Sequence, residues 1–399
     1  MIDYLLFGLF AATLLGIAAN HKRAVPIAAA GLAAVAVVRV TATPFDPLAH
    51  LAHEAHTIAN LGGLLVGFSV LANHFEKSHL PERLMRVLPA GRLGAFSLLV
   101  LVAVMSSILD NIAAALIGGA AAVTLFRRRV HVGYLAAIVA ASNAGGAGSV
   151  IGDTTTTMIW IAGVPPLRLV GAWVGAAVAI LFFGWFAARQ QHALQPLVRE
   201  RGARSAAADH PLDLGRVAVV LLILVSAIAT NVWLETPALG VWGAIAVGCG
   251  WRLPDWRVLG PAVVGACFLL SLVLCASMMP VESLPDAGPW TALGLGAVSA
   301  CFDNIPLTAL AIRQGGYDWA MLAFCVGYGG SMLWFGSSAG VAISGLFPEA
   351  KSVRAWIANG WHVAVGYVLG FFAMLLVLGW QPGPDPDAAT PPPAVEPPR

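Results

Sequence analysis

The sequence predicts an all-α polytopic membrane protein with about ten transmembrane helices, two of them broken, and two re-entrant hairpins. Three observations support this fold class: 59% of the 399 residues are hydrophobic, only 11% are charged, and apolar stretches of helical length recur along the chain. A soluble domain has about 25% charged residues, and a single core of this size could not bury so many apolar side chains. The composition therefore excludes a soluble enzyme, a nucleic-acid-binding protein and a disulfide-rich secreted domain.

The apolar stretches follow one another along most of the chain. In 1–20 the basic cluster follows the apolar run, which is the reverse of a signal peptide, so we expect a retained span. A helix needs about 20 residues to cross the ~30 Å hydrocarbon layer, and several stretches are shorter or longer than that. The predicted stretches are 1–20, 24–40, 57–73, 92–108, 112–126, 134–163, 168–188, 215–233, 237–250, 259–279, 290–301, 305–314, 318–346 and 356–379.

Two pairs of stretches meet at an Asp-Asn dipeptide. The arms of 92–126 meet at Asp110-Asn111, and those of 290–314 meet at Asp303-Asn304. As a helix, the arm 112–126 would extend only about 22 Å, which is too short for a full crossing. We therefore predict that each pair is a hairpin that enters and leaves by the same face. Two full spans would also leave the ends on one side, so that alternative stays open.

Two long stretches contain glycine-rich interruptions. The stretch 134–163 would be about 45 Å long as one straight helix, but it is interrupted at 143–148, and 318–346 is interrupted at 327–330. We expect each to be one broken crossing. With ten crossings and both termini outside, the inner face receives most of the 22 basic residues, as the positive-inside rule predicts. The exceptions are Arg39, Arg168, Arg313 and Arg399.

The two halves of the chain share one plan. Ser-Ser-Ile-Leu-Asp-Asn-Ile at 106–112 corresponds to Ser-Ala-Cys-Phe-Asp-Asn-Ile at 299–305. Gly-Gly followed by Gly-Asp-Thr within 145–154 corresponds to Gly-Gly followed by Gly-Ser-Ser within 329–338. The halves start on opposite sides, which predicts inverted repeats with a site at mid-membrane between broken helices. The predicted organisation is a first repeat at 1–188, a cytoplasmic basic linker at 189–214, a second repeat at 215–380 and a disordered proline-rich tail at 381–399.

Three of the 20 acidic residues lie at these interruptions: Asp110, Asp153 and Asp303. An Asp at the bilayer centre costs about 2.5 to 3.5 kcal/mol on insertion scales, and the predicted membrane interior contains no Lys or Arg. Such carboxylates are stable when protonated or when they coordinate a cation, so a site that alternates between these states exchanges protons for cations. The alternative is helix capping, although Ser or Asn would cap equally well without a charge.

Hydroxyl and amide side chains surround the interruptions, and their oxygens suit a small hard cation such as Na⁺. They are Ser106, Ser107, Asn111, Asn143, Ser149, Thr154, Thr155, Thr156, Thr157, Ser299, Asn304, Ser331, Ser337 and Ser338. Alternatively, individual Ser and Thr hydroxyls bond to the preceding helical turn. We expect the outer residues His50, His53 and His56 to lie in a solvated loop rather than to form a metal-binding helical stripe, and His362 to be a core histidine bonded to a carbonyl.

The Asp-Asn hairpins and the run Gly-Gly-Ala-Gly-Ser-Val-Ile-Gly-Asp-Thr-Thr-Thr-Thr at 145–157 resemble the NhaD-type sodium/proton antiporters. These belong to the ion-transporter superfamily, which also contains arsenite permeases and dicarboxylate/sodium symporters. The resemblance covers most of 57–379, and it implies exchange of Na⁺ or Li⁺ for H⁺. Bulky Trp334 and Phe335 are departures that narrow the site. By resemblance, the essential residues are Ser106, Asp110, Asn111, Asn143, Asp153, Thr154, Thr155, Thr156, Ser299, Asp303, Asn304, Ser331 and Ser337.

The leading hypothesis is a secondary active Na⁺/H⁺ antiporter, which is not an enzyme and needs no cofactor besides the transported ions. Asp110 and Asp303 would carry the exchanged charge, and Asp153 and the threonines would complete the coordination. The alternatives are a sodium-coupled carboxylate symporter or arsenite/oxyanion permease of the same architecture, and an intramembrane sensor without flux. No Gly-x₄-Gly-Lys-Ser/Thr motif is present, so ATP drive is not expected. The expected partners are the lipid bilayer of a bacterial inner (plasma) membrane and small cations, with no nucleic acid and with a homodimer left open.

Overall fold

The computed structural model describes residues 2–20, 23–197 and 211–383, and every regular element within these ranges is helical. Seven described helices are long and apolar enough to cross a membrane. The chain is therefore an integral membrane protein, as its composition predicts. The long helices are α1 (Ile2–Ala19), α2 (Ala24–Ala42), α3 (Pro47–Glu76), α9 (Ala172–Leu194), α10 (Leu214–Leu234), α12 (Leu259–Ser277) and α17 (Val353–Val377).

The shorter helices begin and end at the predicted interruptions. The arms of the two predicted hairpins are separate helices, and each long stretch that contains a glycine-rich interruption is divided into helical pieces. Their bounds are α5 (Gly91–Ser106), α6 (Asn111–Leu125), α7 (Val132–Gly146), α8 (Thr154–Ile161), α11 (Pro237–Gly248), α13 (Pro289–Ser299), α14 (Asn304–Gln314), α15 (Trp319–Ala323), the π-helical turn η5 (Phe324–Tyr328) and α16 (Ser338–Leu346). The predicted helix breaks are thus confirmed.

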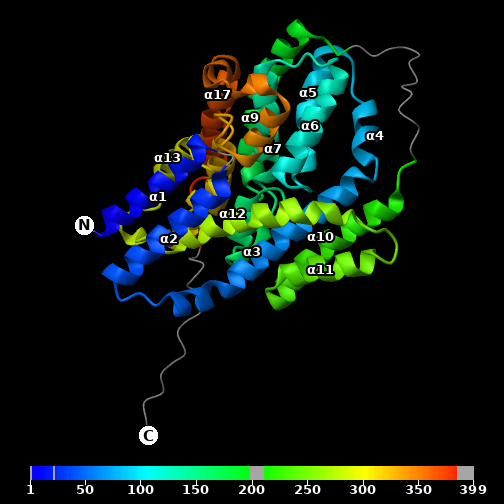
Figure 1. Cartoon of the computed structure of the whole chain (residues 1–399). Coiled ribbons are helices and arrows are strands. Elements are labelled where there is room, and N and C mark those ends of the chain that lie inside the picture. Colours follow the sequence, from blue (N-terminus) through cyan, green and yellow to red (C-terminus); the bar gives the residue numbers. More distant parts are fainter. Residues whose placement is uncertain (1, 21–22, 198–210, 384–399) are drawn as a thin grey trace.

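Figure 1 shows two groups of helices that run in different directions. Helices α5, α6, α7, α9 and α17 stand side by side, and α3, α10, α11 and α12 lie across them. Helix α7 is at the centre of the first group, where it packs against α5, α6, α9 and α17, and its residues from Gly133 to Gly146 are all buried. The interruption at the end of α7 therefore lies inside the protein and away from lipid.

Glycines allow the broken helices to approach the predicted hairpins closely. A Cβ on Gly145, at the end of α7, would collide with the backbone carbonyl of Ala103 in α5. A Cβ on Gly329, after η5, would collide in the same way with the backbone carbonyl of Gly296 in α13. Only a residue without a side chain permits such an approach of two backbones. The same local contact therefore occurs once in each half of the chain.

The prediction of a loop around the outer histidines is wrong, because α3 begins at Pro47 and includes His50, His53 and His56. Asp46 caps this helix by accepting the N–H of Leu48 at 2.9 Å, and proline is favoured in a first helical turn. The His50 ring lies 2.9 Å from the Ser277 hydroxyl of α12. Within the described residues, no group of three His, Cys, Asp or Glu side chains is placed so that it could hold a metal ion.

Two further helix boundaries differ from those predicted. Helix α9 continues to Leu194, so the predicted linker begins as helix, and a short helix, α4 (Leu80–Arg86), follows α3. His362 is buried, and its Nε2 lies 3.1 Å from the side-chain carbonyl oxygen of Gln190, so the prediction of a core histidine bonded to a carbonyl is confirmed. Positions 198–210 of the linker, with Arg199, Arg201 and Arg204, and positions 384–399 of the tail lie outside the described residues.

Candidate ion-binding site

The three candidate carboxylates all begin helices. Asp110 precedes α6, Asp153 precedes α8 and Asp303 precedes α14, and each side chain accepts backbone N–H groups of the first turn, as N-cap residues do. Among the described residues, none of them forms an ion pair with Lys, Arg or His. The N–H donors are Ile112 at 2.9 Å and Ala113 at 3.0 Å for Asp110, Thr155 at 3.2 Å for Asp153, and Ile305 at 3.1 Å for Asp303.

Asp153 is the most deeply buried of the three, with 1% of its surface exposed. The Asn304 side chain, at the start of α14, donates its amide to both Asp153 carboxylate oxygens at 3.4 Å. The hydroxyl of fully buried Thr155 has no hydrogen-bond partner within the described chain. Gly327 of η5 completes this group, since a Cβ there would lie 3.0 Å from Asp153 Oδ2 and 3.7 Å from Thr155 Oγ1. We call these four residues the Asp153 cluster.

A second buried group is built around Asn143, in the last turn of α7. Asn111, the first residue of α6, donates its side-chain amide to Asn143 Oδ1 at 2.9 Å. Asn143 Nδ2 in turn donates to the hydroxyls of Ser331 at 2.9 Å and Ser337 at 3.2 Å. These four residues, the Asn143 cluster, are neutral and nearly inaccessible to solvent. The structure thus brings together side chains that lie up to 226 positions apart in the sequence, between Asn111 and Ser337.

Three other candidate hydroxyls bind backbone carbonyls and support the interruptions. A hydroxyl that donates to a nearby carbonyl satisfies a backbone group that the broken helix leaves without a partner. Thr154 instead faces a cavity. The hydroxyl bonds are Ser106 to Gly152 O at 3.4 Å, Ser299 to Val326 O at 2.8 Å and Thr156 to Ser149 O at 2.6 Å.

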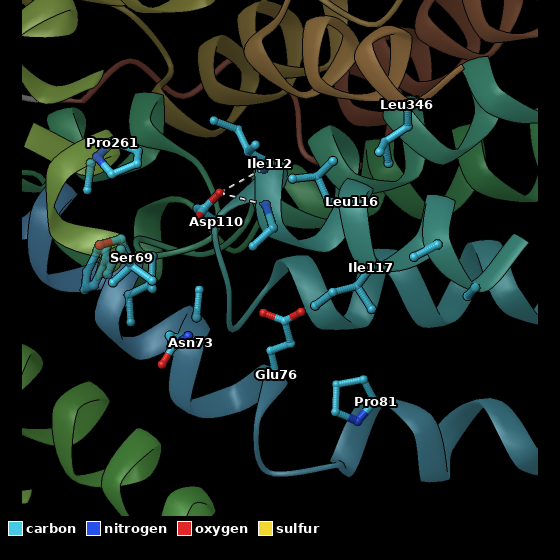
Figure 2. Close-up of a pocket in the computed structure, with 18 of the residues that line it drawn as sticks. Ser69, Asn73, Glu76, Pro81, Asp110, Ile112, Leu116, Ile117, Pro261 and Leu346 are labelled. Atoms are coloured by element: carbon cyan, nitrogen blue, oxygen red, sulfur yellow. Dashed lines mark hydrogen bonds between the residues drawn. The ribbon is translucent and has the colours of Figure 1, made fainter. Parts of the chain in front are cut away.

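Asp110 lies at a large cavity of about 1190 Å³. Thr154 also lines this cavity, and the acidic side chains Glu76 and Glu82 line it together with the basic side chains Arg83 and Arg86. Figure 2 shows the Glu76 carboxylate pointing into the space between the end of α3 and α6, on the side where Asp110 caps α6. Glu76 is not among the predicted site residues, although its position just after the apolar stretch 57–73 is visible in the sequence.

Asp303 lies at a different and smaller cavity, of about 160 Å³. The Ser338 hydroxyl donates to Asp303 Oδ2 at 3.2 Å, and Ser338 and Phe335 both line the cavity. Phe335 therefore lies beside the space that Asp303 borders, and the narrowing of the site by Trp334 and Phe335 stays a prediction. The carboxylates of Asp110 and Asp303 thus border separate cavities, whereas Asp153 is enclosed by protein.

Comparison with known proteins identifies the type of protein. A family model described as a citrate transporter matches residues 9–327. The chain is 30% identical over 326 residues to sodium/proton antiporter 1 of Arabidopsis thaliana, which covers 68% of this chain and 54% of that protein. It is 27% identical over 317 residues to the Na⁺/H⁺ antiporter NhaD of Halomonas elongata, covering 60% and 58%. The similarity to NhaD that the motifs indicate is confirmed, and the chain spans somewhat more than half the length of these relatives.

Proposed function

Since this chain belongs to the citrate transporter family, we propose that it is a secondary active transporter that exchanges Na⁺, or Li⁺, for H⁺ across a bacterial inner (plasma) membrane. The similar proteins of Arabidopsis thaliana and Halomonas elongata are named for sodium/proton antiport. The lipid bilayer and the two transported ions are the partners that this activity requires. A homodimer stays a prediction of the sequence.

The observation that supports exchange most directly is the environment of Asp153. Its carboxylate is 1% exposed, and no described basic side chain pairs with it. A buried unpaired charge is strongly unfavourable, so the carboxylate is stable either as the neutral acid or with a cation beside it. The unpartnered Thr155 hydroxyl provides a further oxygen ligand of the kind that Na⁺ binds, and the Asn304 side chain, which donates its amide N–H to the carboxylate at 3.4 Å, favours the ionised form.

We propose that Asp110 and Asp303 carry protons between the cavities and this central site. Each borders a cavity of its own, whereas Asp153 is enclosed. Arg83 at the larger cavity belongs to the basic set that the positive-inside rule assigns to the inner face, so we place the opening of that cavity on the cytoplasmic side. Na⁺ and protons then compete for the same carboxylates, and Na⁺ affinity falls as the pH falls.

We further propose that the two halves are inverted repeats with re-entrant hairpins. The sequence correspondence between 106–112 and 299–305 supports this arrangement, and so does the matching backbone contact of Gly145 with Ala103 and of Gly329 with Gly296. Alternating access would then move the hairpins and broken helices as a unit against the first spans of each half.

The experiment is a cation panel in vesicles that contain the purified protein and a pH-sensitive dye, run at several pH values. We expect addition of Na⁺ or Li⁺ to move protons in the opposite direction, with an apparent Na⁺ affinity that weakens as the pH is lowered. K⁺ serves as the comparison cation. Vesicles in which no cation of the panel changes the internal pH would contradict the proposal.

A second candidate is sodium-coupled carboxylate transport, which the citrate transporter family description favours. The cavity of about 1190 Å³ is large enough for an organic anion. However, three carboxylates and no described basic partner disfavour an anion unless bound cations neutralise the site first. Uptake of radiolabelled citrate or succinate that depends on Na⁺ would support this candidate over antiport.

A further inference from the structure

The two buried clusters occupy corresponding places in the two halves of the chain. Asn111 and Asn304 are corresponding residues of the two Asp-Asn motifs. Asp153 and Ser337 correspond in the same way, because each follows the glycine that lies six residues after the Gly-Gly pair of its half. By the same register, Asn143 corresponds to Gly327, since each lies two residues before its Gly-Gly pair. Three members of the Asn143 cluster therefore correspond to three members of the Asp153 cluster: Asn111 to Asn304, Asn143 to Gly327, and Ser337 to Asp153. The fourth members do not correspond, because Ser331 aligns with Ala147 and Thr155 aligns with Ala339.

The chemistry of the two places is opposite. In the Asp153 cluster, Gly327 stands at the position that corresponds to Asn143, and it has no side chain. A Cβ added to Gly327 would lie 3.0 Å from the Asp153 carboxylate and 3.7 Å from the unpartnered Thr155 hydroxyl. In the Asn143 cluster, the position of Asp153 is taken by Ser337, so the place contains no negative charge.

In the Asn143 cluster, the Asn143 amide group contacts the oxygens that a bound cation would contact. Its NH₂ group, which carries the positive end of the amide dipole, donates to the oxygens of Ser331 and Ser337 at 2.9 and 3.2 Å. Its carbonyl accepts from Asn111 at 2.9 Å. A serine oxygen that already accepts a short hydrogen bond is less available to a metal ion, and no space for an ion remains where the amide lies.

We propose that, among the described residues, the Asp153 cluster is the only place that binds the transported cation, and that in the Asn143 cluster the Asn143 side chain fills the corresponding place instead of a second cation. This inference rests on the proposed cation transport and adds its stoichiometry: one cation bound per chain. Asn143 and Gly327, together with Ser337 and Asp153, are then the residues that make the two corresponding places unequal.

The test is the number of Na⁺ ions bound per chain, measured with ²²Na⁺ on purified protein in lipid nanodiscs at a pH where the carboxylates are ionised. We expect one Na⁺ for the wild type. Gly327→Asn should abolish saturable binding, because the new amide would occupy the remaining place. The reciprocal variant, Asn143→Gly combined with Ser337→Asp and Ala339→Thr, should bind two Na⁺ ions, because it gives the second place the corresponding residues of the first.

The outcomes are distinguishable. Two Na⁺ ions per wild-type chain, or one that persists in Asp153→Asn, would overturn the inference even if Na⁺/H⁺ exchange is intact. A count of one in the wild type that stays at one in the folded reciprocal variant would overturn the role of Asn143. By contrast, one Na⁺ bound at the Asp153 cluster without any proton exchange would contradict the proposed function and leave this inference standing. The wild-type count alone decides the stoichiometry if a variant does not fold.

Discussion

Asn304 donates its side-chain amide to both carboxylate oxygens of Asp153 at 3.4 Å, although the two residues are 151 positions apart. This contact joins the Asp-Asn interruption between α13 and α14 to the interruption between α7 and α8. Because both residues start a helix, the meeting point is surrounded by interrupted backbone rather than by continuous helices. Movement of either element relative to the other must therefore change the surroundings of the Asp153 carboxylate.

Asp153→Asn should remove exchange without unfolding the protein. Asn and Asp are about equally good N-caps, so the first turn of α8 remains capped and the free energy of unfolding changes little. The charge that attracts the cation is lost, so Na⁺-induced proton movement in vesicles should fall to that of vesicles without protein. The matched control is Asp46→Asn, at an exposed N-cap of α3, which should exchange normally. Undiminished exchange by Asp153→Asn would contradict the proposed site.

Thr155→Val should weaken Na⁺ binding but preserve stability. The Thr155 hydroxyl is buried and has no partner in the described chain, so its removal should leave the free energy of unfolding unchanged or raise it by about 1 kcal/mol. The matched control is Thr157→Val, which loses hydrogen bonds to Val150 O at 2.8 Å and Asp153 O at 3.1 Å. That variant should be less stable by about 1 to 3 kcal/mol. Thermal unfolding and ²²Na⁺ binding measure the two effects; equal Na⁺ affinity in wild type and Thr155→Val would exclude Thr155 as a ligand.

Glu76→Gln should slow the approach of cations to the large cavity. The Glu76 carboxylate points into this cavity, which Asp110 also lines, and a negative side chain raises the local concentration of cations. We expect the KM for Na⁺ to rise roughly two- to fivefold at low ionic strength and less at 0.15 M salt, where the Debye length is about 8 Å. The control Glu349→Gln removes a carboxylate that does not line the cavity. A change that is independent of salt would argue against an electrostatic role.

Asp213 should make a small, pH-dependent contribution to stability at the start of α10. A hydrogen bond from Arg252, at 2.9 Å, holds the pKa of the Asp213 carboxyl below its ordinary value. Because the pKa is lower in the folded state, this stabilisation is fully present above the unfolded pKa of about 4 and is lost as the pH falls through the folded pKa. For a largely solvent-exposed pair it amounts to about 0.2 to 1 kcal/mol.

The measurement is thermal unfolding of the wild type and of Asp213→Asn between pH 3 and pH 7, values chosen to bracket the carboxyl range. Asn keeps the N-cap of α10, so only the charge is removed. The difference in stability should be largest at pH 7 and should disappear at the acid end. A difference that does not vary with pH would show that the charge of Asp213 contributes nothing.

The interruptions and helix caps were predictable because they depend on neighbouring residues. Each Asp that accepts the N–H groups of its own first turn needs only the two or three residues that follow it. The start of α3 was predictable on the same grounds, from Asp46 and Pro47. However, the histidines that follow lower the hydropathy of the first turns of α3, so this segment did not resemble a membrane helix. The assignment of hydroxyls was less predictable: Thr155 and Thr156 are adjacent and chemically identical, yet one is unpartnered and the other bonds to Ser149 O.

The sequence by itself determined that this chain is an integral membrane protein with broken helices and three Asp residues at the breaks, because hydrophobicity, glycine and helix capping act over a few residues. Only the tertiary structure decided which of these Asp residues is enclosed, which amide reaches it, and that Asn143 bonds to Asn111, Ser331 and Ser337. These features depend on where backbones from both halves of the chain come into contact, and local sequence does not specify contacts between residues more than a hundred positions apart.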